Sequence, residues 1–146
     1  MVSIITPVYN GETFIRQCFE CIQSLEYNKI EWIVINDGSQ DSSLEILQEL
    51  KSDKFKINIL NQENYGPAEA RRVGALASNA SYIEYLDIDD IIKNNSICLA
   101  MKKFIDGIDF VMFKKILLKN NLCIEVEPYT DYWPQRGTDV FKSCID

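Results

Sequence analysis

Three aspartates follow one apolar stretch of the chain and are the residues best suited to chemistry. Asp87, Asp89 and Asp90 come directly after residues 82–86, whose aromatic and large apolar side chains are typical of a strand. Carboxylates crowded at one strand end repel each other, and a divalent cation such as Mg²⁺ or Mn²⁺ relieves that repulsion through oxygen ligands. The same residues also fit an acidic turn in which Asp90 or Asn94 caps the next helix. Both interpretations stay open at this point.

The elements that would position these aspartates alternate regularly along the chain. Apolar, β-rich runs predict strands at residues 2–8, 30–35, 57–60, 82–86 and 108–113, and helical spacing predicts helices at 14–25, 42–50, 67–77 and 94–105. This order predicts an α/β, Rossmann-like fold with a mostly parallel sheet and helices on both faces.

Residues 1–113 are expected to form this core, and residues 114–146 a shorter and less regular region. In that region, residues 116–118 and 123–126 favour a hairpin, and Thr138 can cap a last short helix.

The predicted strand ends carry polar, aromatic and acidic groups. In an open parallel sheet, ligands bind outside the carboxyl ends of the strands, so these groups are expected to share one rim. They are Thr6, Pro7, Tyr9 and Asn10 after the first strand, Asp37, Gly38 and Ser39 after the second, Asn61, Asn64, Tyr65 and Gly66 after the third, and Asp87, Asp89 and Asp90 after the fourth.

Each of these groups has a functional and a structural interpretation. Tyr9 can stack on a flat base or simply pack half-buried at the rim. Asp37 can accept a strong, charge-assisted hydrogen bond from a base N–H, or it can serve the turn before Gly38. Of the adjacent Arg71 and Arg72, one can reach the rim and pair with phosphate, which leaves the other as a surface charge.

Charge and length restrict the possible partners. A chain of 146 residues makes one domain with a sizeable core, and its net charge of −7 argues against nucleic acid or an anionic membrane surface. A phosphate ester would need local positive charge from a metal ion or from arginines. Because the chain has neither a GxxxxGK[ST] loop nor a GxGxxG motif after the first strand, a metal at the aspartates is favoured.

Other features favour a cytoplasmic protein. The chain opens directly into the first predicted strand at Val2, so no signal peptide is expected, and no apolar run approaches the ~20 residues of a membrane span. Cys18 and Cys21 have CxxC spacing, but the chain has no second pair and no histidine, which argues against zinc. We expect both thiols to be small helix hydrophobes in a reducing compartment.

Three segments carry a resemblance to a known family. They are VSIITPVYNGETFI at the start, VINDGSQDSS after the second strand, and NYGPAEARRVGALASNASYIEYLDIDD further on. In this order they resemble the family-2 glycosyltransferases of the GT-A fold, over about the first two thirds of the chain. The resemblance implies a nucleotide-sugar donor, most often one based on uridine diphosphate (UDP).

The resemblance also implies a set of site residues. By position, the nucleotide site comprises Thr6, Pro7, Tyr9, Asp37, Arg71, Asp87 and Ile88. Asp37 would read the uracil. Asp87 and Asp89 match the family's DxD pair, with Asp89 as direct ligand of Mn²⁺ or Mg²⁺ and Asp90 in support.

The implied reaction is sugar transfer with inversion. The metal would stabilise the diphosphate as leaving group while an acceptor hydroxyl attacks the anomeric carbon with help from a carboxylate base. The implied acceptor is a glycan or a lipid-linked molecule in surface polysaccharide synthesis, which would bring the full-length protein to the inner face of the membrane.

The chain also departs from the family. Such enzymes are usually longer, and their catalytic base lies in a second half that is not matched here, so no base is assigned. Asn36 replaces a common aspartate and Arg72 a common asparagine, while the late carboxylates Glu125, Glu127 and Asp131 lie in no recognised motif. The chain is therefore interpreted as the donor-binding part of such an enzyme.

Other interpretations remain. A non-catalytic binding or assembly module with the donor fold explains the short chain equally well. A phosphate-receiver signalling domain would need acidic residues where residues 6–10 read TPVYN, and a DxD phosphatase places its aspartates after the first strand. An incomplete sheet would also leave an exposed edge, which is compatible with self-association.

Overall fold

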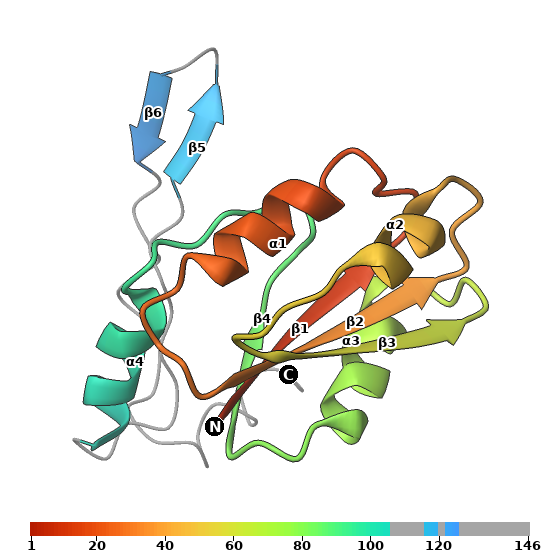
Figure 1. The fold of residues 1–146 in the computed structure, drawn as a ribbon. Helices are drawn as coiled ribbons and strands as arrows, with labels where there is room; N and C mark the ends of the chain where they lie inside the picture. Colours follow the sequence, from red (N-terminus) through yellow and green to blue (C-terminus); the bar gives the residue numbers. More distant parts are fainter. Residues whose placement is uncertain (106–115, 120–121, 126–146) are drawn as a thin grey trace, which may run out of the picture. The chain divides into compact units, whose positions relative to one another are not determined.

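A computed structural model of the chain describes residues 1–105, 116–119 and 122–125 (Figure 1). The chain divides into two compact units, residues 1–95 and 96–146, and each is treated by itself. The predicted boundary after residue 113 falls outside the described residues, as do the strand predicted at 108–113 and the helix predicted after Thr138.

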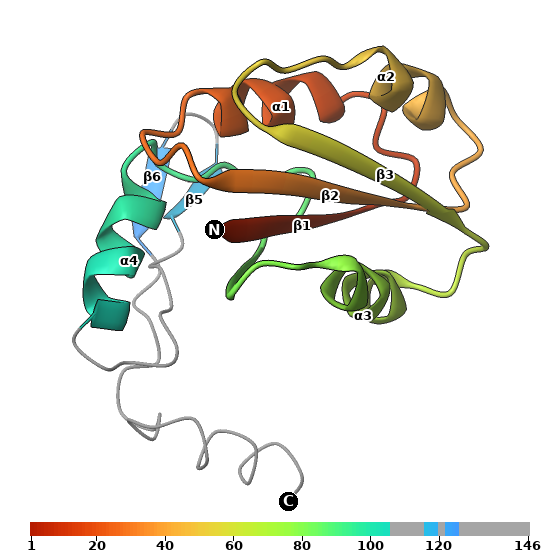
Figure 2. The same cartoon turned by 60° about the horizontal axis from the view of Figure 1, so that its bottom comes forward.

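The first unit is built on four parallel strands in the order β3-β2-β1-β4. They are β1 (Val2–Val8), β2 (Ile30–Asp37), β3 (Lys56–Gln62) and β4 (Tyr82–Tyr85). Helices α1 (Ile15–Gln23) and α2 (Ser43–Glu49) lie on one face of this sheet, and α3 (Pro67–Ala77) covers the other (Figure 2). The predicted α/β fold, with a mostly parallel sheet and helices on both faces, is confirmed.

The burial of the strands explains their composition. All residues of β1 except Pro7 and all residues of β2 except Glu31 are buried, because helices cover these central strands on both faces. Continuous Val- and Ile-rich runs are what such doubly covered parallel strands require. The two outer strands, β3 and β4, are only partly buried.

On one face, helix α3 packs directly against the sheet. Ala70 of the helix joins the buried cluster of Ile5, Ile33 and Ile35. Gly74 sits at the closest approach, since a Cβ atom there would collide with Ile5 and lie 2.7 Å from Ile35 Cδ1. The small residues of this helix therefore set its distance from β1 and β2.

On the other face, aromatic residues connect helix α1 to the sheet. The buried Trp32 of β2 stacks with Phe19 of α1 at a centroid distance of 6.2 Å, and Phe19 meets Phe55 edge to face. The indole Nε1 of Trp32 donates a hydrogen bond to Thr6 Oγ1 (2.9 Å). A buried indole N–H needs such a partner, so Thr6 completes this core.

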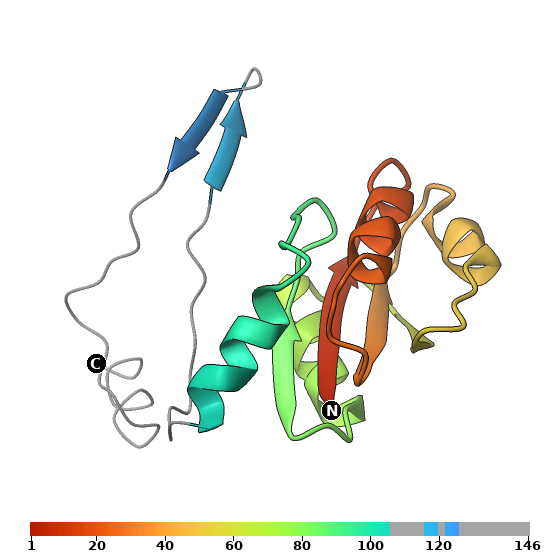
Figure 3. The ribbon, with the colours of Figure 1, turned by 60° about the vertical axis from the view of Figure 1, so that its left-hand side comes forward.

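The second unit contains helix α4 (Ser96–Ile105) and the strands β5 (Ile116–Lys119) and β6 (Leu122–Glu125). Figure 3 shows β5 and β6 side by side as an antiparallel pair. In their register, Leu118 lies opposite Cys123. The hairpin predicted from the sequence is thus confirmed. Among the described helices of the whole chain, none has the length and apolar character needed to cross a membrane.

Candidate functional site

All four strands of the first unit run in the same direction, so their carboxyl ends meet at one edge of the sheet (Figure 1). Asp37 ends β2, and Tyr9 follows the end of β1. Beyond β4, Leu86 N donates to Ile5 O (3.0 Å), which continues the strand pairing to the residue before Asp87. Tyr9, Asp37 and Asp87 therefore lie on one rim, as the strand pattern predicted.

The loop that carries Tyr9 is fastened to the neighbouring β2–α2 loop. Asn10 adopts a left-handed backbone conformation with φ of 50°, which asparagine tolerates better than most residues. Its backbone N–H donates to Ser39 Oγ (3.1 Å), and its side-chain Oδ1 accepts a hydrogen bond from Gln40 N (2.8 Å). These reciprocal bonds fix the backbone next to Tyr9, whose side chain is 49% exposed.

The two residues expected beside Tyr9 are less exposed. Thr6 is fully buried and its hydroxyl is engaged by Trp32, while Pro7 is half-buried. Of these three residues, Tyr9 therefore has the side chain most open to a flat ligand.

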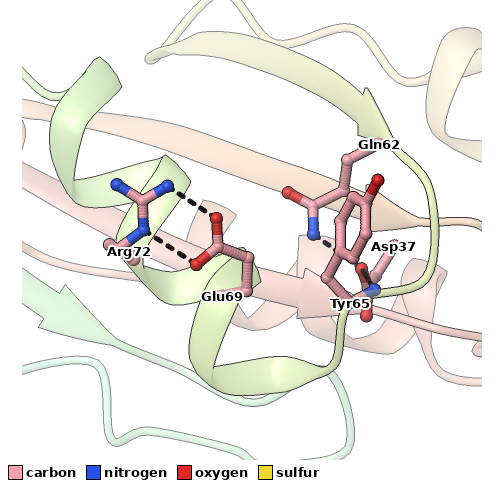
Figure 4. Close-up of polar contacts among 5 residues, drawn as sticks. All are labelled: Asp37, Gln62, Tyr65, Glu69 and Arg72. Atoms are coloured by element: carbon pink, nitrogen blue, oxygen red, sulfur yellow. Dashed lines mark hydrogen bonds and ion pairs between the residues drawn. The ribbon is translucent and has the colours of Figure 1, made fainter.

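Asp37 is only 2% exposed, and its carboxylate accepts three hydrogen bonds, of which Figure 4 draws those from Gln62 and Tyr65. Oδ1 receives Gln62 Nε2 (2.7 Å) and the backbone N–H of Tyr65 (3.0 Å), and Oδ2 receives the backbone N–H of Gly66 (2.9 Å). Asp37 thus holds the β3–α3 loop against the end of β2. The turn role expected before Gly38 was therefore incomplete, because the main partners come from a loop about 28 residues further along the chain.

Gln62, the last residue of β3, was not among the predicted site residues. It lies opposite Asp37 in the parallel register, and its amide nitrogen reaches that carboxylate. Its Oε1 is buried and has no hydrogen-bond partner within the described part of the chain. A signal for Gln62 existed in the sequence, since it stands at a strand end between the selected Asn61 and Asn64.

The two adjacent arginines of α3 have different partners. Arg71 Nη2 contacts Asp87 Oδ1 at 2.5 Å, with both side chains partly buried. Arg72 makes two hydrogen bonds to Glu69, at 2.8 and 2.6 Å, along the exposed side of the helix (Figure 4). The Arg72 guanidinium lowers the pKa of Glu69. Arg71 is therefore the arginine that reaches the acidic rim.

The acidic motif forms a tight turn. Asp90 N donates to Asp87 O (3.0 Å), so Ile88 and Asp89 occupy the tip. Ile88 packs toward the loop after β1, because a Cβ atom built on Gly11 would lie 3.3 Å from Ile88 Cγ2. Asp89 is exposed at this tip. The turn thus presents a carboxylate to solvent while a neighbouring apolar side chain anchors it.

The segment after this turn is attached to helix α1. Cys21 Sγ donates to Ile92 O (3.2 Å) and accepts from Ile92 N (3.4 Å), and Glu26 N donates to Asn94 O (2.8 Å). Cys21 therefore contributes hydrogen bonds as well as volume.

The CxxC thiols are not poised for redox or metal chemistry. Burial, together with the charges of Cys21 and Asp90, raises the pKa of Cys18 to about 12. Burial also raises the pKa of Cys21, against a smaller opposing effect of the Ile92 backbone. Both thiols are free, which agrees with the expectation of small hydrophobes in a helix.

The aspartates offer suitable oxygen ligands for Mg²⁺ or Mn²⁺, although no group of three or more His, Cys, Asp or Glu side chains among the described residues is arranged to hold a metal ion. Mg²⁺ in nucleotide sites is commonly bound by one or two carboxylates, with phosphates and waters completing the shell. The exposed Asp89 and the partly buried Asp87 fit such a site, which a diphosphate would complete.

Comparison with known proteins decides the family. The family model described as glycosyl transferase family 2 matches residues 3–118. The chain belongs to this family. It is 35% identical over 105 residues to glycosyltransferase GlyA of Streptococcus pneumoniae, a match that covers 72% of this chain and 15% of GlyA. It is 36% identical over 98 residues to GlyG of the same organism, covering 66% of this chain and 33% of GlyG.

Solved structures agree with the family assignment. The glycosyltransferase-family chain superimposes on S. aureus TarS with a TM-score of 0.65 at 26% identity, covering 73% of this chain and 19% of TarS. A TarS fragment, residues 1–349, crystallised in complex with UDP, gives a TM-score of 0.64 at 25% identity and covers 73% of this chain and 32% of that one. The GT-A fold is therefore confirmed, and the chain spans a minor part of these relatives' length.

Proposed function

We propose that this family-2 chain binds the nucleotide-diphosphate sugar donor of a glycosyltransferase, and that the donor is UDP-linked. The observation that carries the proposal is the common rim, where the buried Asp37 ends β2 and the acidic Asp87–Asp90 turn follows β4, the two parallel strands that flank β1. The UDP complex of TarS supports this choice of ligand.

The base half of the proposed site lies at the ends of β1 and β2. The Asp37 carboxylate accepts an N–H of the base, and its burial makes that hydrogen bond stronger than it would be in water. Tyr9, half exposed on a loop fixed by Asn10, offers its ring to the face of the base. Thr6 and Pro7 form the strand end behind them.

The diphosphate half of the proposed site lies at the Asp87–Asp90 turn. Asp89 and Asp87 would hold Mg²⁺ or Mn²⁺, with Asp90 in support, and the cation would supply charge stabilisation to the departing diphosphate. Arg71 adds positive charge at the same place through its contact with Asp87. Ile88 keeps the turn against Gly11. An acidic chain thereby gathers local positive charge where an anionic ligand needs it.

The proposed reaction is transfer of the sugar, with inversion, to a glycan or lipid-linked acceptor of a surface polysaccharide. A carboxylate base must accept the proton of the attacking hydroxyl. Glu127 and Asp131 lie outside the described residues, and of Glu125 only the backbone is described, so the base stays unassigned.

Calorimetric titration of the chain with UDP, with and without Mn²⁺, tests the proposal. We expect binding that Mn²⁺ strengthens about tenfold or more, and Asp89→Asn should remove that gain. Asp53→Asn, at an exposed aspartate before β3, is the matched control and should keep it. No heat of binding under either condition would overturn the proposal.

The rival function, a non-catalytic donor-binding module, rests on the small share of GlyA and TarS that the chain covers. Slow hydrolysis of a UDP-sugar by the purified chain, abolished by Asp89→Asn, separates the two functions. An enzyme fragment should release UDP, whereas a binding module should bind the donor and leave it intact.

A further inference from the structure

We propose that Gln62 controls access of the nucleobase to Asp37. Its side-chain amide donates to the Asp37 carboxylate, and the N–H of the base displaces that amide when the base binds. This inference rests on the proposed function, because it assumes that Asp37 reads the base. It concerns a residue at the end of β3 that sequence reasoning passed over.

The Asp37 carboxylate is closed off by its own chain. Asp37 is 2% exposed. Its carboxylate accepts hydrogen bonds from the side-chain amide of Gln62 and the backbone N–H of Tyr65 (Figure 4), and from the backbone N–H of Gly66. A base N–H can reach this carboxylate only if a covering group moves. The two backbone donors belong to the loop that leads into α3, whereas the Gln62 amide can leave by side-chain rotation alone.

The Gln62 amide is also poorly satisfied where it lies. Its nitrogen makes one charge-assisted hydrogen bond of 2.7 Å to Asp37, but its carbonyl oxygen Oε1 is buried without a partner among the described residues. A bond to a charged group and an unpaired buried acceptor have effects of similar size and opposite sign. If Gln62 rotates toward solvent, it loses the hydrogen bond to Asp37, but its Oε1 gains hydrogen bonds to water. The free-energy cost of displacing the Gln62 amide is therefore small.

The position of Gln62 provides room for this movement. β3 is the outer strand of the sheet on this side, and Gln62 is its last residue and is only half-buried. An imide N–H, such as N3–H of uracil, can then take the place of Gln62 Nε2 on Asp37 Oδ1. Cytosine has an acceptor instead of an N–H at N3, so it cannot make this bond from the same ring position.

Binding of UDP to Gln62→Leu and Gln62→Met tests the inference, because both side chains are similar in size and cannot occupy Asp37 as donors. We expect UDP to bind about threefold to tenfold more tightly to both variants than to the unmodified chain. N3-methyl-UDP, which lacks the imide proton, should show no gain. Gln48→Leu, an equivalent change on the exposed side of α2, should leave the UDP affinity unchanged.

The outcomes separate this inference from the proposed function. If the unmodified chain does not bind UDP, the proposed function fails. If it binds UDP and the Gln62 variants bind equally or more weakly, the exchange is wrong, and Gln62 acts as a support for the carboxylate. A gain that also appears with N3-methyl-UDP would equally overturn it.

Discussion

Asp37 and the Asp87–Asp90 turn lie on the same rim of the sheet, yet their carboxylates differ in burial and in hydrogen-bond partners. Asp37 is buried and surrounded by three internal donors, so its position is fixed before any ligand binds. Asp89 is exposed, and Asp87 has one ion pair, with Arg71. In the proposed site, the base half would thus be prepared by folding, whereas the diphosphate half would be completed by a cation and phosphate oxygens.

The largest loss of folding stability is expected from removing the Asp37 carboxylate. Asp37→Ala leaves the part-buried donors of Tyr65, Gly66 and Gln62 without their acceptor, so it should destabilise the chain by about 3 kcal/mol. Urea unfolding measures this loss, and Asp53→Ala, at an exposed aspartate, should change stability by less than ~0.5 kcal/mol. A loss below ~1 kcal/mol for Asp37→Ala would mean that its carboxylate does not hold the β3–α3 loop.

A third carboxyl group shows what burial does without internal donors. Glu84 of β4 pairs with β1 through its backbone, but its carboxyl group has no hydrogen bond to a described side chain, and burial raises the pKa of this group to about 7. Since the folded-state pKa lies above the unfolded value, the ionised form is disfavoured by folding. The chain should therefore be most stable below about pH 4.5 as far as Glu84 is concerned, and should lose that stability as the pH rises to 7.

Glu84→Gln tests this expectation. The variant should be more stable than the unmodified chain by about 2 kcal/mol at pH 8, and the difference should vanish at about pH 3.5, below the unfolded-state pKa of 4.5, where Glu84 is protonated in both states. Thermal unfolding at the two pH values measures the effect. Glu20→Gln on the exposed side of α1 is the control. An equal gain at both pH values would point to packing and not to charge.

The smallest expected effect, on UDP affinity, distinguishes the two neighbouring arginines of α3. Arg71→Ala should weaken UDP binding about tenfold, because it removes positive charge beside Asp87. Arg72→Ala should leave UDP binding unchanged and have little effect on stability, because its pair with Glu69 is solvent-exposed. The dissociation constants of UDP for the two variants, measured by calorimetry at one salt concentration, test this difference. Equal effects of both changes would make Arg71 an ordinary surface charge.

The fold was predictable from the sequence because its determinants are local or periodic. The doubly buried β1 and β2 are continuous apolar runs, and Pro67 begins α3 after the left-handed Gly66. The common rim followed from the alternation of strands and helices, since parallel strands place their carboxyl ends together.

The partners at the rim were less predictable, because they depend on side-chain contacts between distant residues. Nothing in the sequence indicates that both oxygens of Asp37 are taken by the β3–α3 loop, or that the Thr6 hydroxyl serves Trp32. The choice between Arg71 and Arg72 depends on which side of α3 faces the turn after β4. Predicting such contacts requires the register of the strands and the distance between helix and sheet, as well as the pattern of apolar residues.

The packing of Gly74 connects the two halves of the site. Helix α3 touches β1 and β2 at this glycine, and the same rigid helix begins at the loop latched by Asp37 and carries Arg71 to Asp87. The position of this helix on the sheet therefore depends on the absence of a side chain at Gly74. A side chain at Gly74 would clash with Ile5 and Ile35 and would shift the helix, so it should disturb both halves of the proposed nucleotide site at once without contacting either.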